Sequence, residues 1–272
     1  QTYKNLYNTV PSGSELIQGE LLSNFKERRT YFNLFFDSKY TFSKKIHYTL
    51  GLNLNKTSYH LKDNLINNIP NFSGNYSFKT MISPKIGVVY KNSLSTMLYG
   101  SISHGFSPPT LEETLLPDGL INSTIEPESG WNYEIGSRGQ LFKNTVYFDI
   151  AIYRMNVKNL LVARRTNNDE YMGVNAGKTQ YNGLEFTLKN TFIKTKNITL
   201  FGFHSFAYND FKFKKFIDDS NDYSNNLLTG VPKLTYNATI GLESLNGFYT
   251  SVNYSFVGEI PLRDDNSVYS DE

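Results

Sequence analysis

The stretch that decides the fold reads IHYTLGLNLN, residues 46–55. Its even-numbered positions are all apolar, and its odd-numbered positions hold His, Thr, Gly or Asn. Because successive side chains of a strand point to opposite faces, this segment has one apolar and one polar face. It predicts a strand that separates an apolar medium from water.

Similar alternation recurs along the rest of the chain, and no amphipathic helix of useful length interrupts it. Further strands are predicted at residues 31–40, 82–90, 95–107, 131–139, 146–162, 184–188, 198–208, 234–243 and 248–256. The facing of residues 95–107 stays open, since Met97 and Tyr99 compete with Leu98 and Ile102 for the apolar face. The prediction is therefore about ten antiparallel strands.

The connections between these strands alternate in length. Short turns are expected at residues 43–45, 91–93, 143–144, 194–196 and 245–247, and a hairpin at 167–168. Long polar loops are expected at residues 60–76, 108–127 and 209–232, and residues 1–24 are expected to be loop or a frayed strand end. Short turns at one end and long loops at the other are typical of a transmembrane β-barrel. A soluble sandwich would have shorter strands and no such asymmetry.

The composition fits this class and excludes others. The net charge of the 272 residues is only +2, which argues against a nucleic-acid partner. The chain has no cysteine, so it has neither disulfides nor thiolate metal sites. It has 20 Tyr and 20 Phe, residues that are favoured in strands and at membrane interfaces. No apolar run approaches the roughly 20 residues of a spanning helix.

The motifs lie between residues 99 and 139. Pro108 and Pro109 cannot donate to a sheet ladder, so they end one strand and begin a long loop. The next strand places Trp131, Tyr133 and Ile135 on one face. The sequences GFSPP (105–109), NSTIEPE (122–128) and NYEIG (132–136) frame this loop.

These three motifs resemble those of the TonB-dependent receptors of Gram-negative outer membranes. GFSPP resembles the family's Phe-Arg-Ala-Pro box, with Ser107 in place of the usual Arg. NSTIEPE resembles its Asn-Pro-Asn-Leu-x-Pro-Glu box, with Ser123-Thr124 in place of Pro-Asn. NYEIG resembles its Asn-x-Glu-x-Gly strand.

The resemblance extends from about residue 30 onward and implies an all-β, antiparallel barrel of 22 strands around an N-terminal plug. About ten of those strands, from the later half, are expected here. With short turns in the periplasm, both chain ends fall outside the cell. We therefore expect residues 1–272 to be part of a receptor barrel, lacking the plug, the early strands and the last strands. No signal sequence opens the chain, which agrees with this expectation.

The function that the resemblance implies is active transport across the outer membrane, with no enzymatic step and no cofactor. The expected cargo is a ferric siderophore or a similar scarce nutrient, captured by the outer loops and moved when TonB pulls on the plug. The implied partners are outer-membrane lipid, the TonB complex and the cargo. Two alternatives remain open from the residues themselves: a self-contained outer-membrane enzyme, such as a surface protease, and a passive porin.

Candidate site residues fall into two groups. The polar strand faces carry Glu134, Arg138, Asp149, Glu185 and Glu243, which are expected to face the lumen either as a polar path around a plug or as ordinary cross-strand charge pairs. Phe106, Arg164, Arg165 and Tyr171 are candidates for contact with the cargo. The two arginines would bind an anionic ferric chelate by charge-assisted hydrogen bonds. The simpler interpretations are that Phe106 and the prolines shape a loop and that the arginines lie on a solvated loop tip.

No metal site is predicted. Asp218, Asp219 and Asp222 lie close in sequence, but their spacing is not that of an EF-hand loop. A haem receptor of this family would have a histidine between the first two boxes. None lies between Phe106 and Asn122, which disfavours haem as the cargo.

Overall fold

The computed structural model describes residues 2–8, 21–65, 71, 73–110, 112–114, 121–165, 171–218 and 221–271. Side chains are described from residue 24 onward within these ranges, except at residues 112, 163–165, 171 and 176. The secondary structure elements are β1 (Thr2–Asn8), β2 (Leu21–Thr41), β3 (Ile46–Asp63), β4 (Gly74–Ser77), β5 (Met81–Lys91), β6 (Thr96–Ser107), the 3₁₀ helix η1 (Glu112–Thr114), β7 (Glu128–Leu141), β8 (Val146–Arg165), β9 (Tyr171–Lys194), β10 (Ile198–Asp218), β11 (Asn221–Asp222), β12 (Leu234–Ser244) and β13 (Tyr249–Val257). Within the described part of the chain, no helix is long and apolar enough to cross a membrane.

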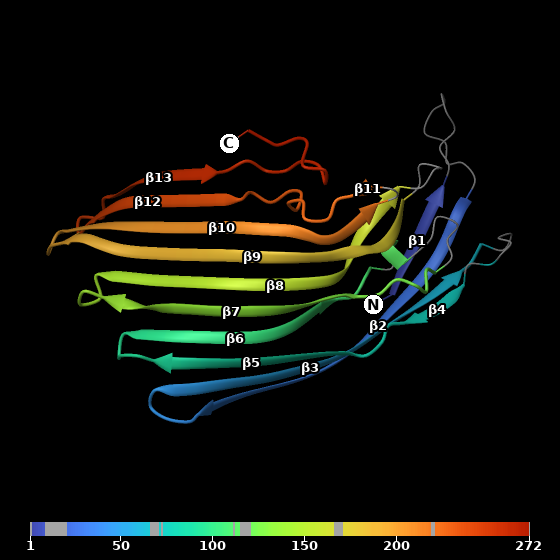
Figure 1. Ribbon diagram of the computed structural model, residues 1–272, viewed down its shortest axis with the longest axis horizontal. Coiled ribbons are helices and arrows are strands. Elements are labelled where there is room, and N and C mark those ends of the chain that lie inside the picture. The colour runs from blue at the N-terminus through green and yellow to red at the C-terminus, as the bar shows by residue number, and fades with distance from the viewer. Residues whose placement is uncertain are drawn as a thin grey trace.

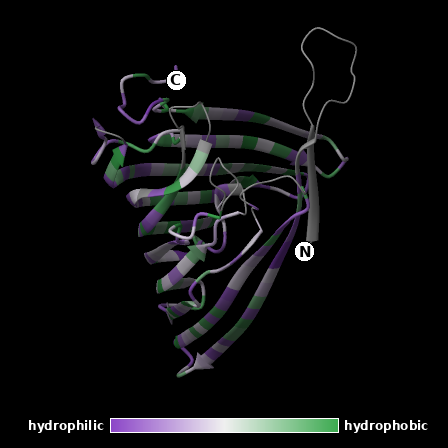
Figure 2. Ribbon diagram, turned by 90° about the vertical axis from the view of Figure 1, so that its right-hand side faces the viewer, coloured by the Kyte–Doolittle hydropathy of each residue, from purple (hydrophilic) through white to green (hydrophobic). Residues whose placement is uncertain are grey.

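The strands form one antiparallel sheet in a single curved layer (Figures 1 and 2). The order β1-β2-β3-β5-β6-β7-β8-β9-β10-β12-β13 follows the sequence, with β4 beside β3 and β11 beside β10. Ten of these strands form the main wall, as predicted, and β1, β4 and β11 are short additions. Short turns gather at the left end of the sheet in Figure 1 and longer connections at the right end.

The predicted alternation of faces is confirmed. We call the face that carries Leu50, Ile86 and Ile152 the outer face and the opposite one the inner face. These three side chains are 49%, 57% and 54% exposed, although they are aliphatic. The open question on β6 is settled, because Leu98 and Ile102 are exposed on the outer face while the Tyr99 ring lies on the inner face over Gly136.

Along each long strand the polarity of the two faces reverses partway. On β3 the outer face is apolar up to Leu54 and then carries Lys56, Ser58, His60 and Lys62. The inner face of the same segment carries Tyr59 and Leu61, which are 3% and 1% exposed. We call the part of the sheet between the short turns and this reversal the turn half, and the part beyond it the loop half.

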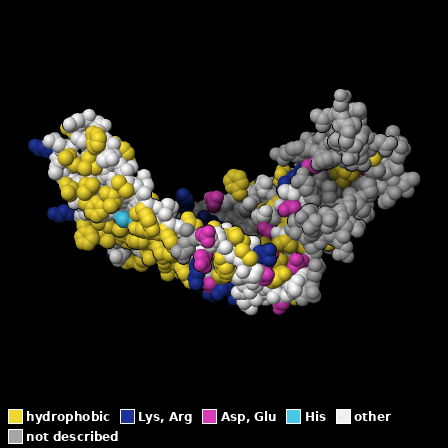
Figure 3. Space-filling view, turned by 90° about the horizontal axis from the view of Figure 1, so that it is seen from above, with side chains coloured by type: hydrophobic (Ala, Val, Ile, Leu, Met, Phe, Trp, Pro, Cys, Tyr) yellow, Lys and Arg dark blue, Asp and Glu magenta, His cyan; other side chains and the backbone are white. Residues whose placement is uncertain are grey.

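The reversal falls at corresponding places on the other long strands. On β8, β9 and β10 the last apolar outer residues are the register partners Ile152, Leu184 and Tyr208. On β3 and β5 the last apolar outer residues are the register partners Leu54 and Ile82. Following the register from Ile152 across the sheet leads to Val88 on β5 and Tyr48 on β3. Leu54 and Ile82 each lie six residues nearer the loops than these two residues. The boundary therefore runs obliquely across the strands, as in a barrel whose strands tilt from its axis. In Figure 3 apolar side chains gather over the turn half, and most acidic side chains in view lie towards the loops.

Three loop predictions were wrong in part. Residues 1–24 contain β1 and the start of β2, β3 continues to Asp63 with β4 beside it, and β10 continues to Asp218. For the segments of β3 and β10 the cause is the reversal of polarity: polar outer residues made them resemble loops, while their inner residues are apolar and packed. Phe213 and Phe216 of β10, for example, are 4% and 3% exposed. The predicted hairpin at 167–168 lies outside the described residues, although Arg165 and Tyr171 on either side of it are register partners.

Candidate ligand-facing wall and its loop-end support

The inner face of β7, β8 and β9 forms a hollow of about 730 Å³. Glu134, Asp149 and Glu185 all contribute to its lining. Strand alternation aims all three carboxylates to this side, and Glu185 lies opposite Ala151 in the ladder, so its carboxylate has a small neighbour. The structure therefore brings three of the five predicted lumen residues into one hollow.

Aromatic rings lie flat along this wall and keep it open. A Cβ on Gly136 would collide with the ring of Tyr99, and one on Gly183 would collide with the ring of Tyr153. Each ring therefore covers a glycine on the neighbouring strand instead of standing up into the lumen. These tyrosines were not among the site residues predicted from the sequence. Their signal was an aromatic residue on the inner face opposite a glycine, which requires the register to be known.

The remaining lumen candidates lie nearer the short turns. The guanidinium of Arg138 lies 5.3 Å from the centroid of the Tyr99 ring, and Arg138 is the register partner of Asp149. The hydroxyl of Tyr147 donates to Oδ2 of Asp149 at 3.3 Å. Glu243 of β12 is the register partner of Thr199 and Tyr249 and does not line the hollow. It is therefore separate from the carboxylate group.

The predicted cargo contacts are only partly described. Phe106 lies on the rim of the hollow, one residue before β6 ends at Ser107. The two prolines follow at once, as predicted, and the buried carbonyl of Pro109 accepts a hydrogen bond from the hydroxyl of Tyr59. Arg164, Arg165 and Tyr171 pair across β8 and β9 at the backbone, but their side chains lie outside the described residues.

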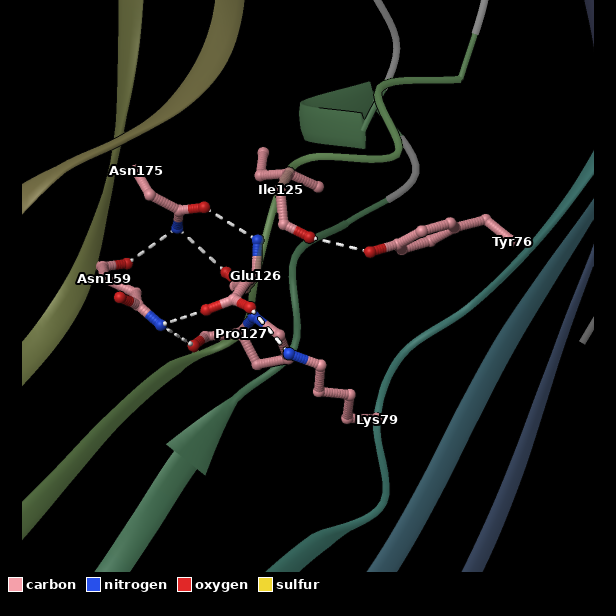
Figure 4. Close-up of polar contacts among 7 residues, drawn as sticks. All are labelled: Tyr76, Lys79, Ile125, Glu126, Pro127, Asn159 and Asn175. Carbon is pink, nitrogen blue, oxygen red and sulfur yellow. Dashed lines mark hydrogen bonds and ion pairs between the residues drawn. The ribbon is translucent and has the colours of Figure 1, made fainter.

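The second motif forms a hydrogen-bonded node at the loop end (Figure 4). The side chain of Asn175 accepts from the backbone N–H of Glu126 at 2.7 Å and donates to its carbonyl at 2.9 Å. Asn159 donates from Nδ2 to Oε2 of Glu126 at 3.0 Å, and Lys79 pairs with Oε1 at 3.2 Å. On the other side, the hydroxyl of Tyr76 donates to the carbonyl of Ile125 at 2.9 Å. The motif thus fastens the loop to β4, β8 and β9.

An apolar cluster lies beside this node. It consists of Tyr59, Leu61, Phe78 and Ile125, all at most 3% exposed. Burial raises the pKa of Tyr59 to about 12, although the nearby Arg29 opposes the shift. The phenol therefore stays protonated and keeps its bond to Pro109 at all physiological pH values. Sequence reasoning missed this cluster, although the change of apolar positions from even to odd numbers after Leu54 was a usable signal.

The described residues contain no group of three or more His, Cys, Asp or Glu side chains that could hold a metal ion. Asp222 pairs at the backbone with Ile217, and Asp219 of the aspartate-rich segment lies outside the described residues. The wall therefore offers hydrogen-bonding groups and charge.

Comparison with known proteins agrees with this architecture. The sequence matches the family model described as "TonB dependent receptor-like, beta-barrel" over residues 1–271. Among solved structures, the chain superposes on the siderophore receptor PiuA from Acinetobacter baumannii with a TM-score of 0.71 at 17% identity, covering 95% of this chain and 38% of that one. It superposes on the ferric citrate transporter FecA with a TM-score of 0.74 at 17% identity, covering 98% and 38%.

A third match is a protein described as the transporter of a different metal. The copper transporter OprC gives a TM-score of 0.60 at 15% identity, with coverage of 88% of this chain and 36% of that one. At these identities the superpositions establish a common fold. The chain spans less than two fifths of the length of each of these three structures.

Proposed function

Because the chain belongs to the TonB-dependent receptor family of the Gram-negative outer membrane, we propose that it forms barrel wall and outer loops of a receptor that imports a scarce nutrient. This family consists of transport receptors, so the chain is not an enzyme and its site in the cell is the outer membrane. The observation that supports transport most strongly is the inner wall itself: a hollow lined in part by carboxylates and backed by a face of exposed aliphatic side chains.

The proposed cargo is a ferric siderophore. PiuA is described as a siderophore receptor and FecA as a ferric citrate transporter. Arg164 and Arg165 lie at the loop end of β8, where an anionic chelate would arrive. We propose these arginines, Tyr171 and Phe106 as cargo contacts. OprC is described as a copper transporter, so copper is the second candidate cargo.

The proposed mechanism involves no covalent step. The outer loops capture the cargo, TonB pulls on a plug within the complete barrel, and the cargo passes along the inner wall. Glu134, Asp149 and Glu185 would then belong to the polar surface that the plug and the cargo pass. In a passive porin the cargo would cross without TonB, so dependence on TonB separates the two mechanisms.

The test is uptake by a strain that lacks the receptor containing this chain. Cells grown under iron limitation are given radioactive iron bound to each of a panel of siderophores, and separately radioactive copper, in tonB⁺ and tonB⁻ backgrounds. The proposal expects uptake of at least one ferric siderophore to require both the receptor and TonB. Unchanged iron uptake from every source would remove the siderophore assignment, and a loss of copper uptake alone would replace it with copper.

The arginines are tested in the same assay. Replacing Arg164 and Arg165 by Ala is expected to weaken capture of the cargo at least tenfold. The matched control replaces Lys194 and Lys196, two exposed cations at a short turn, by Ala and is expected to leave capture unchanged.

A further inference from the structure

The inner face near the short turns carries a lysine between two aromatic rings. Lys189 of β9 is the register partner of Tyr147 on β8 and of Phe203 on β10, so the three side chains form one row across the inner face. The ammonium nitrogen of Lys189 lies 5.7 Å from the centroid of each ring. Both distances are within the range of a cation–π interaction. We call Tyr147, Lys189 and Phe203 the Lys189 row.

The Lys189 row borders a hollow of about 300 Å³. Thr145, Thr191 and Phe201 are among its other lining residues. The Phe201 ring lies over Gly241, where a Cβ would collide with it, so the ring lies along the wall instead of filling the lumen. Small-molecule sites have volumes of about 300–1,000 Å³. The hollow is therefore large enough for one ring or one carboxylate of a cargo, and not for a whole ferric chelate.

The ammonium group of Lys189 is available to a ligand. Its side chain is exposed, and none of the hydrogen bonds and ion pairs of the described residues involves it. Asp149, the next inner residue of β8 after Tyr147, instead accepts a hydrogen bond from the Tyr147 hydroxyl. The two rings attract the ammonium group but offer it no acceptor oxygen. An anionic oxygen would supply one and form a charge-assisted hydrogen bond.

The position of the Lys189 row indicates at which stage of transport it acts. Along the inner face of β9, Glu185 is followed by Thr187 and then by Lys189. Glu185 and Thr187 line the larger hollow, and Lys189 is the next inner residue towards the short turns. Because short turns lie in the periplasm, an anionic cargo that enters from the loops passes the carboxylates first and meets the lysine near the exit.

We propose that the Lys189 row is a second cargo site at the periplasmic end of the wall. Its ligand is an aromatic group with an anionic oxygen, such as one catecholate arm of a ferric chelate. The rings of Tyr147 and Phe203 stack on the aromatic group, and the ammonium group of Lys189 binds its oxygen. The site receives the cargo after TonB has moved the plug, and it favours passage towards the periplasm. This inference rests on the proposed import of a ferric chelate and adds its chemical class.

The test uses cells that carry the complete receptor containing this chain. Radioactive iron is supplied as its complex with a tris-catecholate, with a tris-hydroxamate or with citrate. Binding to tonB⁻ cells measures capture by the outer loops, and uptake by tonB⁺ cells measures transport. The variants are Lys189→Gln, Lys189→Arg and Phe203→Leu. The control is Lys194→Gln, which removes an exposed lysine at the end of the same strand.

For Lys189→Gln, uptake of the catecholate complex should fall about fivefold, while capture stays unchanged and shows that the variant is folded. Lys189→Arg keeps the charge and should retain at least about half of the wild-type uptake. Phe203→Leu should lower uptake about twofold through the loss of a ring. The control should match the wild type in both measurements.

Three results would overturn the proposal: wild-type uptake of only the two complexes without an aromatic group, equal uptake by the wild type and Lys189→Gln, or an equal loss in the control. Reduced uptake together with greater sensitivity of the cells to vancomycin would show that Lys189 holds the plug in place, and would overturn it too. No uptake of any complex by the wild type would overturn the proposed cargo itself, and this inference with it.

Discussion

The two halves of this sheet are made of the same strands and yet have opposite polarity. In the turn half the outer face is apolar and exposed, and the inner face carries the carboxylates of the hollow. In the loop half the outer face carries lysines, and the inner face holds Tyr59, Leu61, Phe213 and Phe216 in packed clusters. Every buried hydrophobic side chain of the described residues belongs to the loop half or its loops.

The difference shows that the surrounding medium, and not the strand, decides which face is apolar. A strand in a bilayer exposes its apolar side chains to lipid, so the turn half needs no protein core. Beyond the membrane the same strand has water outside, and its apolar side chains turn inward against the loops. Stability in the loop half therefore depends on packing within the protein, whereas in the turn half it depends on lipid.

The largest expected effect comes from the core of the loop half. Phe78 is 2% exposed, and its ring lies 5.6 Å from that of Tyr59 and 4.8 Å from that of Tyr76. Phe78→Ala should reduce the free energy of opening of the loop half by about 3–5 kcal/mol through lost contacts and a cavity. Native-state hydrogen exchange should show faster exchange at residues 57–61 and little change at 46–52.

The matched control for this substitution is Phe142→Ala, since Phe142 lies at a short turn and is 76% exposed. It should cost less than about 1 kcal/mol. Equal losses from the two substitutions would contradict the division of the sheet into a half with a protein core and a half without one.

The next effect tests the lipid-facing half. Leu50 lies at the middle of the apolar outer face of β3, so Leu50→Arg should cost about 2–4 kcal/mol in the membrane. Thr30→Arg, on the outer face of β2 in the loop half, should change stability by no more than about 0.5 kcal/mol. Unfolding in urea from lipid vesicles measures both. Normal assembly of the Leu50→Arg variant would mean that the outer and inner faces are reversed.

A smaller effect is expected from the hydrogen-bonded node. Asn175→Ala removes three hydrogen bonds, two to the backbone of Glu126 and one to the carbonyl of Asn159. The bond to Asn159 is part-buried and the two to Glu126 are exposed, so losing all three should cost about 1–3 kcal/mol. Limited proteolysis of the loop that precedes β7 should become faster. Asn253→Ala, which removes one exposed bond from Thr239, is the control and should leave proteolysis unchanged.

The sequence was sufficient to predict the turn half almost completely. Strict alternation at residues 46–54 is a local signal, and it determined the strands, the facing and the membrane location without knowledge of any contact. The loop half was predicted poorly because its evidence is not local. Tyr59 is buried by Phe78 and Pro109, which lie far along the chain, and a polar residue such as Lys62 on the outer face resembles a loop residue.

For the candidate site, too, local features could be predicted from the sequence and features that depend on cross-strand register could not. The inner facing of Glu134, Asp149 and Glu185 followed from alternation, whereas their meeting in one hollow depends on the register of β7, β8 and β9. Tyr99 and Tyr153 escaped selection because an aromatic residue over a glycine is recognisable only across strands. Whether these residues contact a cargo stays a prediction.

The smallest expected effect is a pH dependence of the outer surface just beyond the reversal. A hydrogen bond from Lys212 is the main cause that lowers the pKa of Asp210, and the amide of Asn182 adds to it at 3.3 Å. A carboxyl whose folded pKa lies below the unfolded value of about 3.9 stabilises the fold above that pH, and the contribution is lost as the pH falls through the folded pKa. The pair is partly exposed to solvent, with 30% of the Asp210 side chain accessible, so its contribution should be under about 1 kcal/mol.

Asp210→Asn should remove this dependence, so the wild type should lose slightly more stability than the variant between pH 5 and the acid limit of folding, on the order of pH 2–3. Lys212→Gln should flatten the profile to a similar extent, because it removes the other partner of the same bond. Denaturant unfolding across this pH range measures the three proteins. If Lys212→Gln keeps the full wild-type profile, the acid sensitivity arises elsewhere. The hydrogen bond from Asn182 to Asp210, and not the ion pair with Lys212, would then stabilise this part of the outer face.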